Sequence, residues 1–233
     1  MRNLIVSLLF AMFGMAAYAD DNGSLIVVEL YTSEGCSSCP AADKILTKLA
    51  AREGILALAL HVDYWDYLGW KDEFSMAKFT DRQEYYNMAL GSRYRLVTPQ
   101  MIFHGQSYVA GAKVKKIEQR LAALRGQSDK VVLQIEKQNG KFSIDINPRD
   151  VSVSGADVFI VEYMPAYITE VEAGENRGLT LNHTNVVTSW ERVGEWSGQD
   201  NWHVEHAVSG DSMAAVIVQT AGSGPILAAR KLK

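Results

Sequence analysis

The sequence predicts an α/β domain followed by an all-β, sandwich-like domain. Between residues 25 and 128, short apolar runs alternate with segments whose apolar residues recur every three to four positions, which is typical of alternating strands and helices. After residue 129 the apolar period changes to two and the helical pattern stops. The chain has 233 residues, of which 48% are hydrophobic, as in globular proteins and unlike disordered ones.

The first half predicts strands and helices in a regular order. A short apolar strand at 25–30 precedes a helix at 40–53, where Ala42, Ile45 and Leu49 fall on one helical face. The continuous apolar run at 55–62 is typical of a parallel strand buried on both faces. A helix at 75–90, a hairpin at 100–104 and 106–110, and a helix at 114–125 follow. This order implies a sheet that begins parallel and ends antiparallel.

The second half predicts short strands without helices. The polar link at 126–129 precedes a hairpin that turns at Asn139-Gly140. Further strands are expected at 157–163, 179–187, 189–196, 202–208, 213–219 and 226–232. Many short alternating strands favour a β-sandwich. We therefore expect one domain over residues 20–128 and a second over residues 129–233.

The N-terminal segment resembles a secretory signal peptide. Met1–Ala19 contains a positive residue, Arg2, an apolar run, and a small-x-small cleavage site at Ala17-Tyr18-Ala19. The expected location is outside the cytoplasm, in the bacterial periplasm, with no membrane span in the mature chain. The formal net charge of −4 gives no basic footprint for nucleic acid.

Cys36 and Cys39 are the only cysteines, which excludes a disulfide scaffold and a four-cysteine zinc site. They follow the first strand and open the first helix, and a helix N-terminus stabilises a thiolate. We expect Cys36 to reach solvent and act as the nucleophile, while Cys39, one turn further on, resolves the mixed disulfide. Glu34, Ser37 and Ser38 are expected to line this site.

Two other interpretations of the pair stay open. In a secreted protein the two cysteines could form a static disulfide. Two thiolates with His61 could also supply three ligands to zinc or copper, although the usual second cysteine pair is missing. The sequence predicts no bound metal and no organic cofactor.

Val97-Thr98-Pro99-Gln100 precedes the predicted hairpin, and with it the order of elements is similar to that of thioredoxin. Residues 25–126 resemble that family. The resemblance implies that Cys36 attacks, that Cys39 resolves, and that Pro99 is a cis-proline whose neighbour Thr98 aligns the substrate backbone. Gly35 stands where the family usually has an aromatic residue. The intervening Ser37-Ser38 leaves the direction of electron flow open.

A loop rich in aromatic and acidic residues, His61 to Trp70, begins where the second strand ends. The carboxyl ends of neighbouring parallel strands share one edge of the sheet, so this loop should border the cysteines. His61 or Asp63 could move a proton to or from Cys39, and Trp65 could form an apolar wall for a substrate. Alternatively, His61 is a hydrogen-bonded residue at the strand end and the tryptophans belong to the core.

Several segments together closely resemble a secreted bacterial family known only as a domain of unknown function with a thioredoxin-like core. They are 32–39, 61–70, Arg82-Gln83 with Tyr86, 98–101 and 174–178. Arg82 and Gln83 could clamp a peptide backbone or belong to an ordinary surface helix. The loop at 174–178 could dock near the cysteines or be purely structural.

The function predicted from these features is a thiol–disulfide oxidoreductase that acts on protein thiols or disulfides. The alternative is a non-catalytic binding module that keeps the fold and carries a structural disulfide. The expected partners are protein substrates or a redox partner protein.

Overall fold

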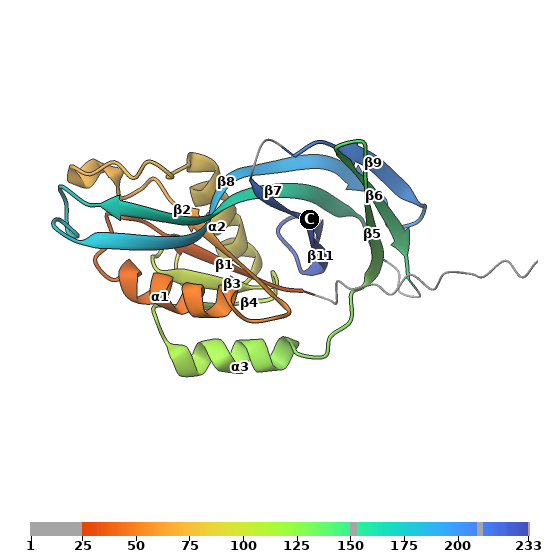
Figure 1. Cartoon of the computed structure of the whole chain (residues 1–233). Coiled ribbons are helices and arrows are strands. Elements are labelled where there is room, and N and C mark those ends of the chain that lie inside the picture. Colours follow the sequence, from red (N-terminus) through yellow and green to blue (C-terminus); the bar gives the residue numbers. More distant parts are fainter. Residues whose placement is uncertain (1–24, 150–152, 209–211, 233) are drawn as a thin grey trace, which may run out of the picture.

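The computed structural model describes residues 25–149, 153–208 and 212–232 (Figure 1). The signal peptide predicted at residues 1–19 lies outside them. The first half contains β1 (Ile26–Thr32), α1 (Cys39–Ala50), β2 (Ile55–His61), the short 3-10 helix η1 (Asp66–Leu68), α2 (Ala77–Ala89), β3 (Gln100–Phe103), β4 (Ser107–Ala110) and α3 (Val114–Leu124). The second half contains β5 (Val131–Gln138), β6 (Lys141–Pro148), β7 (Ala156–Glu170), β8 (Thr180–Trp196), β9 (Trp202–His206), β10 (Met213–Thr220) and β11 (Ile226–Leu232).

The strands form one large sheet and one small sheet. The large sheet has eight strands in the order β11-β10-β7-β8-β2-β1-β3-β4, and the small one has the order β5-β6-β9. Strands β1 and β2 are parallel, whereas β3 and β4 are antiparallel to their neighbours, as the sequence predicted. The mixed α/β class is therefore confirmed.

The large sheet crosses the domain boundary that the sequence predicts at residue 128. Strand β8, from the second half, runs parallel to β2, with Ala59 opposite Val186. Through this pairing β7, β8, β10 and β11 continue the sheet that β1 to β4 begin. The site of the first half therefore has a neighbour from the second half.

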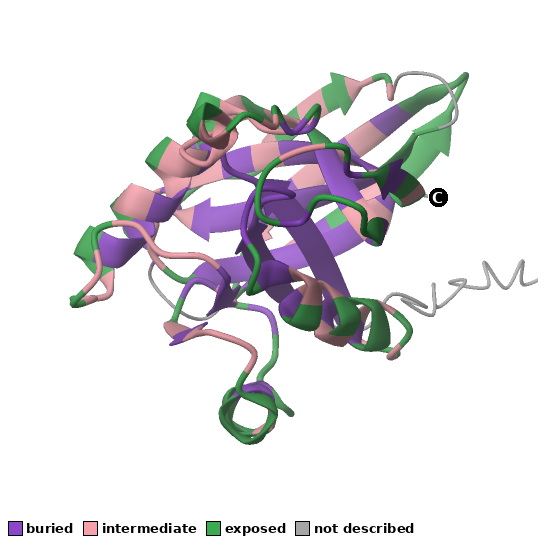
Figure 2. Cartoon of the chain, turned by 90° about the vertical axis from the view of Figure 1, so that its left-hand side faces the viewer, coloured by how far each residue is buried: buried purple, intermediate pink, exposed green. Residues whose placement is uncertain are grey.

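Helices and the small sheet cover the two faces of the large sheet. Helices α1 and α3 pack on one face through Leu46, Leu49 and Ile117. Helix α2 packs on the other face, and its Phe79 and Tyr86 belong to a core that includes residues from both halves. The small sheet packs against β7, β10 and β11, which is the sheet-on-sheet packing of a sandwich. Figure 2 shows the resulting band of buried residues along the large sheet.

Two strands that the sequence predicts at 179–187 and 189–196 form one long strand, β8, so this expectation was wrong. Thr188 lies between them. Ser189 pairs with Glu162 and Val187 pairs with Tyr163, so Thr188 is the extra residue of a β-bulge. A bulge shifts the alternation of faces by one residue, so the apolar pattern breaks although the strand continues. Within the described residues, no helix is long and apolar enough to cross a membrane.

Candidate functional site

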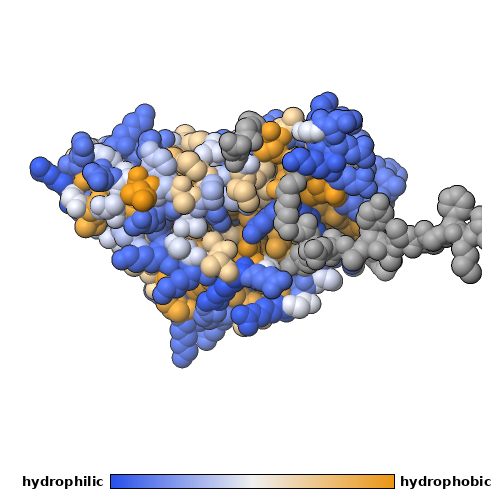
Figure 3. Space-filling model, viewed as in Figure 1, coloured by the Kyte–Doolittle hydropathy of each residue, from blue (hydrophilic) through white to orange (hydrophobic). Residues whose placement is uncertain are grey.

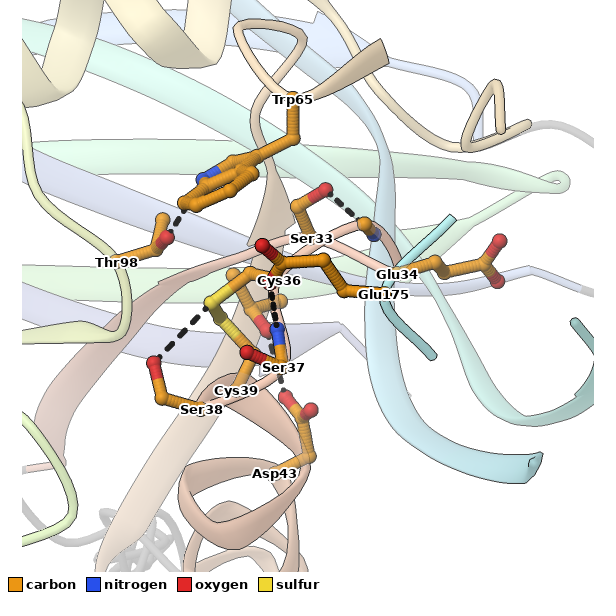
Figure 4. The surroundings of a disulfide bond; sticks show 12 residues. Ser33, Glu34, Cys36, Ser37, Ser38, Cys39, Asp43, Trp65, Thr98 and Glu175 are labelled. Carbon is orange, nitrogen blue, oxygen red and sulfur yellow. Dashed lines mark hydrogen bonds between the residues drawn. A yellow bond between two sulfur atoms is a disulfide. The ribbon is translucent and has the colours of Figure 1, made fainter. Parts of the chain in front are cut away.

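Cys36 and Cys39 form a disulfide at the junction between β1 and α1 (Figure 4). The Cys39 amide donates to the Cys36 carbonyl over 3.0 Å, and Pro40 occupies the first turn of α1, where its missing N–H costs little. The prediction that Cys36 reaches solvent was wrong. Cys36 is 1% exposed and Cys39 is fully buried.

The loop between β7 and β8 is bonded to the backbone around Cys36. The Asn176 side chain donates to the backbone oxygens of Glu34, over 2.7 Å, and of Cys36, over 3.0 Å. The Glu175 carboxylate accepts from the Ser37 amide over 3.2 Å. The loop at 174–178 therefore docks beside the cysteines, as one of the two sequence interpretations proposed.

Ser37 and Ser38 stay exposed and mark the accessible side of the disulfide. They line a groove of about 510 Å³ together with Thr98, Pro99 and residues 110–113. The Ser38 hydroxyl lies 3.4 Å from Cys36 Sγ. The Thr98–Pro99 peptide bond is cis. The structure thus gathers Ser37, Ser38, Thr98 and Pro99 around one space, which we call the disulfide groove.

Trp65 joins the disulfide segment to the segment that carries Pro99. Its indole N–H donates to Thr98 Oγ1 over 2.8 Å, so the ring lies between the two segments (Figure 4). A Cβ atom at Gly35 would lie only 3.1 Å from the Trp65 Cβ. Trp65 therefore occupies the space in front of Gly35, which explains why a larger residue is absent before the first cysteine.

Three polar side chains hold the Pro99 segment from α2 and β3. Gln83 donates to the Val97 carbonyl over 2.6 Å, and Asn87 donates to the Arg95 carbonyl over 2.9 Å. Gln100 bonds to both side chains and is fully buried. Gln83 therefore supports a backbone segment of this chain, and its amide is not free to clamp a peptide.

A cluster of buried titratable groups lies behind the disulfide. His61 Nδ1 is 2.6 Å from Asp72 Oδ2, and both residues are 1% exposed. The Glu34 carboxylate is buried between His183 Nε2 of β8, at 3.0 Å, and the Trp70 indole N–H, at 2.8 Å. The His61 and His183 rings lie edge to face, with centroids 5.0 Å apart.

The protonation of His61 and Asp72 follows from their pairing. Burial alone would lower the pKa of His61, but the charge and hydrogen bond of Asp72 outweigh it, and the pKa is raised. Burial would raise the pKa of Asp72, yet His61 and the amides of Glu34 and Phe74 lower it. While His61 is protonated, the two groups therefore form a buried ion pair.

Among the residues of α1, Asp43 carries the carboxyl group nearest in sequence to the cysteines. It lies one helical turn after Cys39, and it accepts a hydrogen bond from Thr32 Oγ1 over 3.0 Å (Figure 4). Part of the residue is exposed, but its carboxyl group is enclosed by protein. Burial raises the pKa of Asp43 to about 6, although His61 and Thr32 pull it down. Asp43 can therefore exchange a proton near neutral pH.

Two predicted site residues lie away from the disulfide. The Asp63 carboxylate accepts from Thr80 Oγ1 of α2 over 2.6 Å, so it secures the start of that helix. Arg82 forms a bidentate pair with buried Glu29, with N–O distances of 2.8 and 2.9 Å, and its guanidinium lies 3.9 Å from the Trp190 ring centroid. Arg82 therefore stabilises the core and is not available as a peptide clamp.

Sequence reasoning did not identify Asp43, Asp72, His183, Glu175 or Asn176 individually. Asp43 carried a signal, because a carboxylate one turn after a cysteine shares its helical face. Glu175 and Asn176 belong to the polar loop at 174–178, which the sequence allowed to dock near the cysteines without indicating which of its residues would do so. His183 carried no signal, because only the pairing of β8 with β2 brings it to the site. In the described part of the chain, no group of three or more His, Cys, Asp or Glu side chains is arranged to hold a metal ion.

The comparisons with known proteins place the chain in a family. Residues 27–219 match the family described as "Protein of unknown function (DUF1223)", and the chain belongs to this family. A crystal structure of a protein from Agrobacterium tumefaciens is similar over 90% of this chain and 94% of its own, with 32% identity and a TM-score of 0.75.

Two further similarities are more limited. HBP35 of Porphyromonas gingivalis shares the fold over 90% of this chain and 75% of its own, with 13% identity and a TM-score of 0.60. A protein of Archaeoglobus fulgidus described as "Probable Thioredoxin" is 41% identical over 39 residues. That match spans 17% of this chain and 43% of the archaeal protein.

Proposed function

We propose that this protein is a thiol–disulfide oxidoreductase that acts on the cysteines of other proteins in an oxidising compartment, the bacterial periplasm. The observation that carries the proposal is the Cys36–Cys39 disulfide at the start of α1, beside a groove lined by Thr98 and Pro99. The order β1, disulfide, α1, β2, α2, Pro99 and hairpin supports a thioredoxin-like arrangement of the first half. The short match to a probable thioredoxin agrees with this assignment.

The reaction exchanges one disulfide for another. A thiolate of a partner dithiol attacks Cys36 Sγ, the Cys36–Cys39 bond breaks, and its electron pair leaves on Cys39 Sγ, which takes up a proton. The second partner thiolate then attacks the partner sulfur of the mixed disulfide and releases the Cys36 thiolate. The partner loses two electrons and gains a disulfide, while the cysteine pair gains the two electrons. The reverse sequence reduces a partner disulfide.

Asp43 supplies the proton exchange that Cys39 needs. As a leaving group, Cys39 requires a proton, and as a resolving nucleophile it must lose one. A carboxyl group whose pKa is about 6 is present in both protonation states near neutral pH. Asp43 lies on the same face of α1 as Cys39, one turn away, which makes it the nearest candidate on this helix.

The burial of Cys36 favours a second candidate function, a binding module with a structural disulfide. Cys36 is 1% exposed, and Asn176 and Glu175 bind the backbone around it. An oxidoreductase therefore requires more of the Cys36 sulfur to become accessible when a partner binds, whereas a structural disulfide requires no such change.

Alkylation of the reduced protein separates the two functions. We expect the Cys36 thiol of the Cys39→Ala variant to react with iodoacetamide at pH 6 much faster than a free thiol, whose pKa is about 8.5. The same variant, expressed in the periplasm, should accumulate mixed disulfides with partner proteins, whereas the matched Cys36→Ala variant should not. Alkylation at the rate of a free thiol, with no adducts, would establish the structural disulfide instead.

A further inference from the structure

A second groove adjoins the disulfide groove. It has a volume of about 540 Å³ and lies between β4, α3 and the segment after α2. Its charged and aromatic lining consists of Arg93, Tyr94, Tyr108, Lys113, Lys116 and Arg120. We call it the basic groove. In Figure 3 the region of α3, at the bottom of the view, is mostly hydrophilic.

The charge of the basic groove is one-sided. Its lining includes four cationic side chains and no carboxylate, on a chain whose formal net charge is −4. Among the described residues, Lys113, Lys116 and Arg120 form no ion pair with Asp or Glu. The neighbouring Glu118 is turned to Arg52, at 2.7 Å, and does not line the groove. The groove therefore holds positive charge that this chain does not neutralise locally.

The two grooves share part of their lining. Tyr94, Ala110 and Lys113 line both, so the basic groove continues from the space beside Ser37 and Pro99. A partner polypeptide bound in the disulfide groove can therefore extend along the basic groove to Lys116 and Arg120. This continuity points to an extension of whatever binds at the disulfide, and not to a separate ligand.

The floor of the basic groove includes an edge strand. Strand β4 is the last strand of the large sheet and supplies Tyr108, Val109 and Ala110 to the lining. An edge strand offers backbone N–H and C=O groups that an extended polypeptide can pair with. Lys113 precedes the first residue of α3 and Lys116 and Arg120 lie on the helix, at three- and four-residue spacing, so the three cations line one side over about 10 Å, the length of about three extended residues.

We propose that the basic groove binds an acidic, extended segment of the polypeptide whose cysteine reacts at the disulfide. The identity of this ligand as the substrate rests on the function proposed above, and its chemistry rests on the groove. Carboxylates of the segment face the cationic side chains of Lys113, Lys116 and Arg120, while its backbone lies along β4. The protein thereby selects partners that carry acidic residues next to the reactive cysteine.

Binding is tested with the oxidised full chain and fluorescein-labelled decapeptides that alternate serine with glutamate, glutamine or lysine. Fluorescence anisotropy should show binding of the glutamate peptide at least about tenfold tighter than of the other two, and the preference should weaken as salt rises. The Lys116→Glu/Arg120→Glu variant should lose at least about tenfold in affinity. Lys115→Glu is the matched control, because Lys115 is exposed on the same helix but does not line the groove.

Equal affinity for the glutamate and glutamine peptides, or an equal loss in Lys115→Glu, would overturn the proposal. Groove-dependent binding to phosphatidylserine vesicles as strong as to the glutamate peptide would overturn the assignment to a polypeptide. The outcome is independent of redox activity. If Cys36 is inert but the glutamate peptide binds, the proposed function fails and the groove stands. If Cys36 traps partners and charge has no effect, the proposed function stands and the groove assignment fails.

Discussion

Asp43 carries its proton more tightly in the folded protein than in the unfolded chain. Its pKa rises from 3.8 to about 6 because its carboxyl is enclosed. The folded state therefore binds more protons between these two pH values, and the contribution of Asp43 to stability declines as pH rises through them. The raised pKa also allows Asp43 to take part in the proton exchange that we propose for Cys39, because both forms of its carboxyl group are populated near pH 6.

The variant Asp43→Asn tests both consequences. We expect the free energy of unfolding of the variant to increase relative to that of the wild type as pH rises from 3.8 to about 6. The reason is that the variant has no enclosed carboxyl group to ionise. We also expect the wild type to show an inflection near pH 6 in the pH profile of the rate at which a peptide dithiol reduces the disulfide, and the variant to lack it. Urea denaturation and stopped-flow kinetics measure these effects. Parallel pH profiles in the two proteins would exclude Asp43 as the proton donor and acceptor.

The His61–Asp72 pair stabilises the fold over a defined pH window. The raised pKa of His61 means that its contribution is complete below the ordinary value of 6.5 and is lost as pH rises through the raised pKa. The lowered pKa of Asp72 means that its contribution is present above the ordinary value of 3.8 and is lost as pH falls through the lowered pKa. The pair is therefore fully effective between these two ordinary values.

Replacing one member of this pair leaves a buried charge without its partner. In His61→Gln we expect a loss of about 3–5 kcal/mol in the free energy of unfolding inside this window. His203→Gln is the control, because the His203–Asp145 pair is exposed and should contribute no more than about 1 kcal/mol. Equal losses in the two variants would show that the His61–Asp72 pair is not a buried ion pair.

At the scale of elements, we expect the loop between β7 and β8 to limit access to Cys36, because it is bonded to the backbone around this residue. Asn176→Ala removes the two hydrogen bonds to the Glu34 and Cys36 carbonyls. At a net value of about 1 kcal/mol for each bond, reduction by dithiothreitol should accelerate by roughly tenfold or more. Arg177→Ala, at an exposed neighbour, should leave the rate unchanged. An unchanged rate in Asn176→Ala would show that this loop does not limit access.

The elements that the sequence predicted well are those whose signals are local. Helix α1 follows from the spacing of Ala42, Leu46 and Leu49 and from Gly54 after it, and β2 follows from its unbroken apolar run. The length of β8 was not predictable, because the bulge at Thr188 reverses the alternation within a continuous strand. Periodicity describes the faces of an element and carries no information about a bulge.

Site residues that stand in local sequence patterns were predictable, as were the elements with local signals. Cys36, Cys39, Thr98 and Pro99 stand in recognisable local patterns, and the structure brings them together. The burial of Cys36 was not predicted, because the sequence left open whether the loop at 174–178 docks beside the cysteines, and the local pattern of the cysteine pair favours an exposed first cysteine. Asp63 was predicted to face the disulfide because it is an acidic residue of the loop after β2. The sequence gives no sign that its carboxylate accepts a hydrogen bond from Thr80 instead.

At the scale of the whole molecule, the two halves share a sheet and a core. Strand β8 pairs with β2, and Tyr163, Val187 and Ile217 of the second half pack with Leu58 and Phe79 of the first. Arg82 of α2 bonds to Glu29 of β1 and to Gln219 of β10 over 2.9 Å or less. We therefore expect folding of the first half to depend on the second.

A fragment of residues 20–128 tests this dependence. Separation exposes the apolar face that β7, β8, β10 and β11 cover, and it removes the Gln219 partner of Arg82. We expect the fragment to lack the near-ultraviolet circular dichroism of the full chain and to unfold without a cooperative transition. A fragment that unfolds cooperatively, with a free energy close to that of the full chain, would show that the first half is an independent domain.

The reduction potential of the Cys36–Cys39 pair tests the central claim most directly. It is measured by equilibrating the full chain with defined ratios of reduced and oxidised glutathione, then alkylating and separating the two forms. An active pair should lie above about −300 mV and exchange with the glutathione couple. A potential below about −300 mV, with no exchange with the couple, would show that the disulfide is structural and would contradict the assignment as an oxidoreductase.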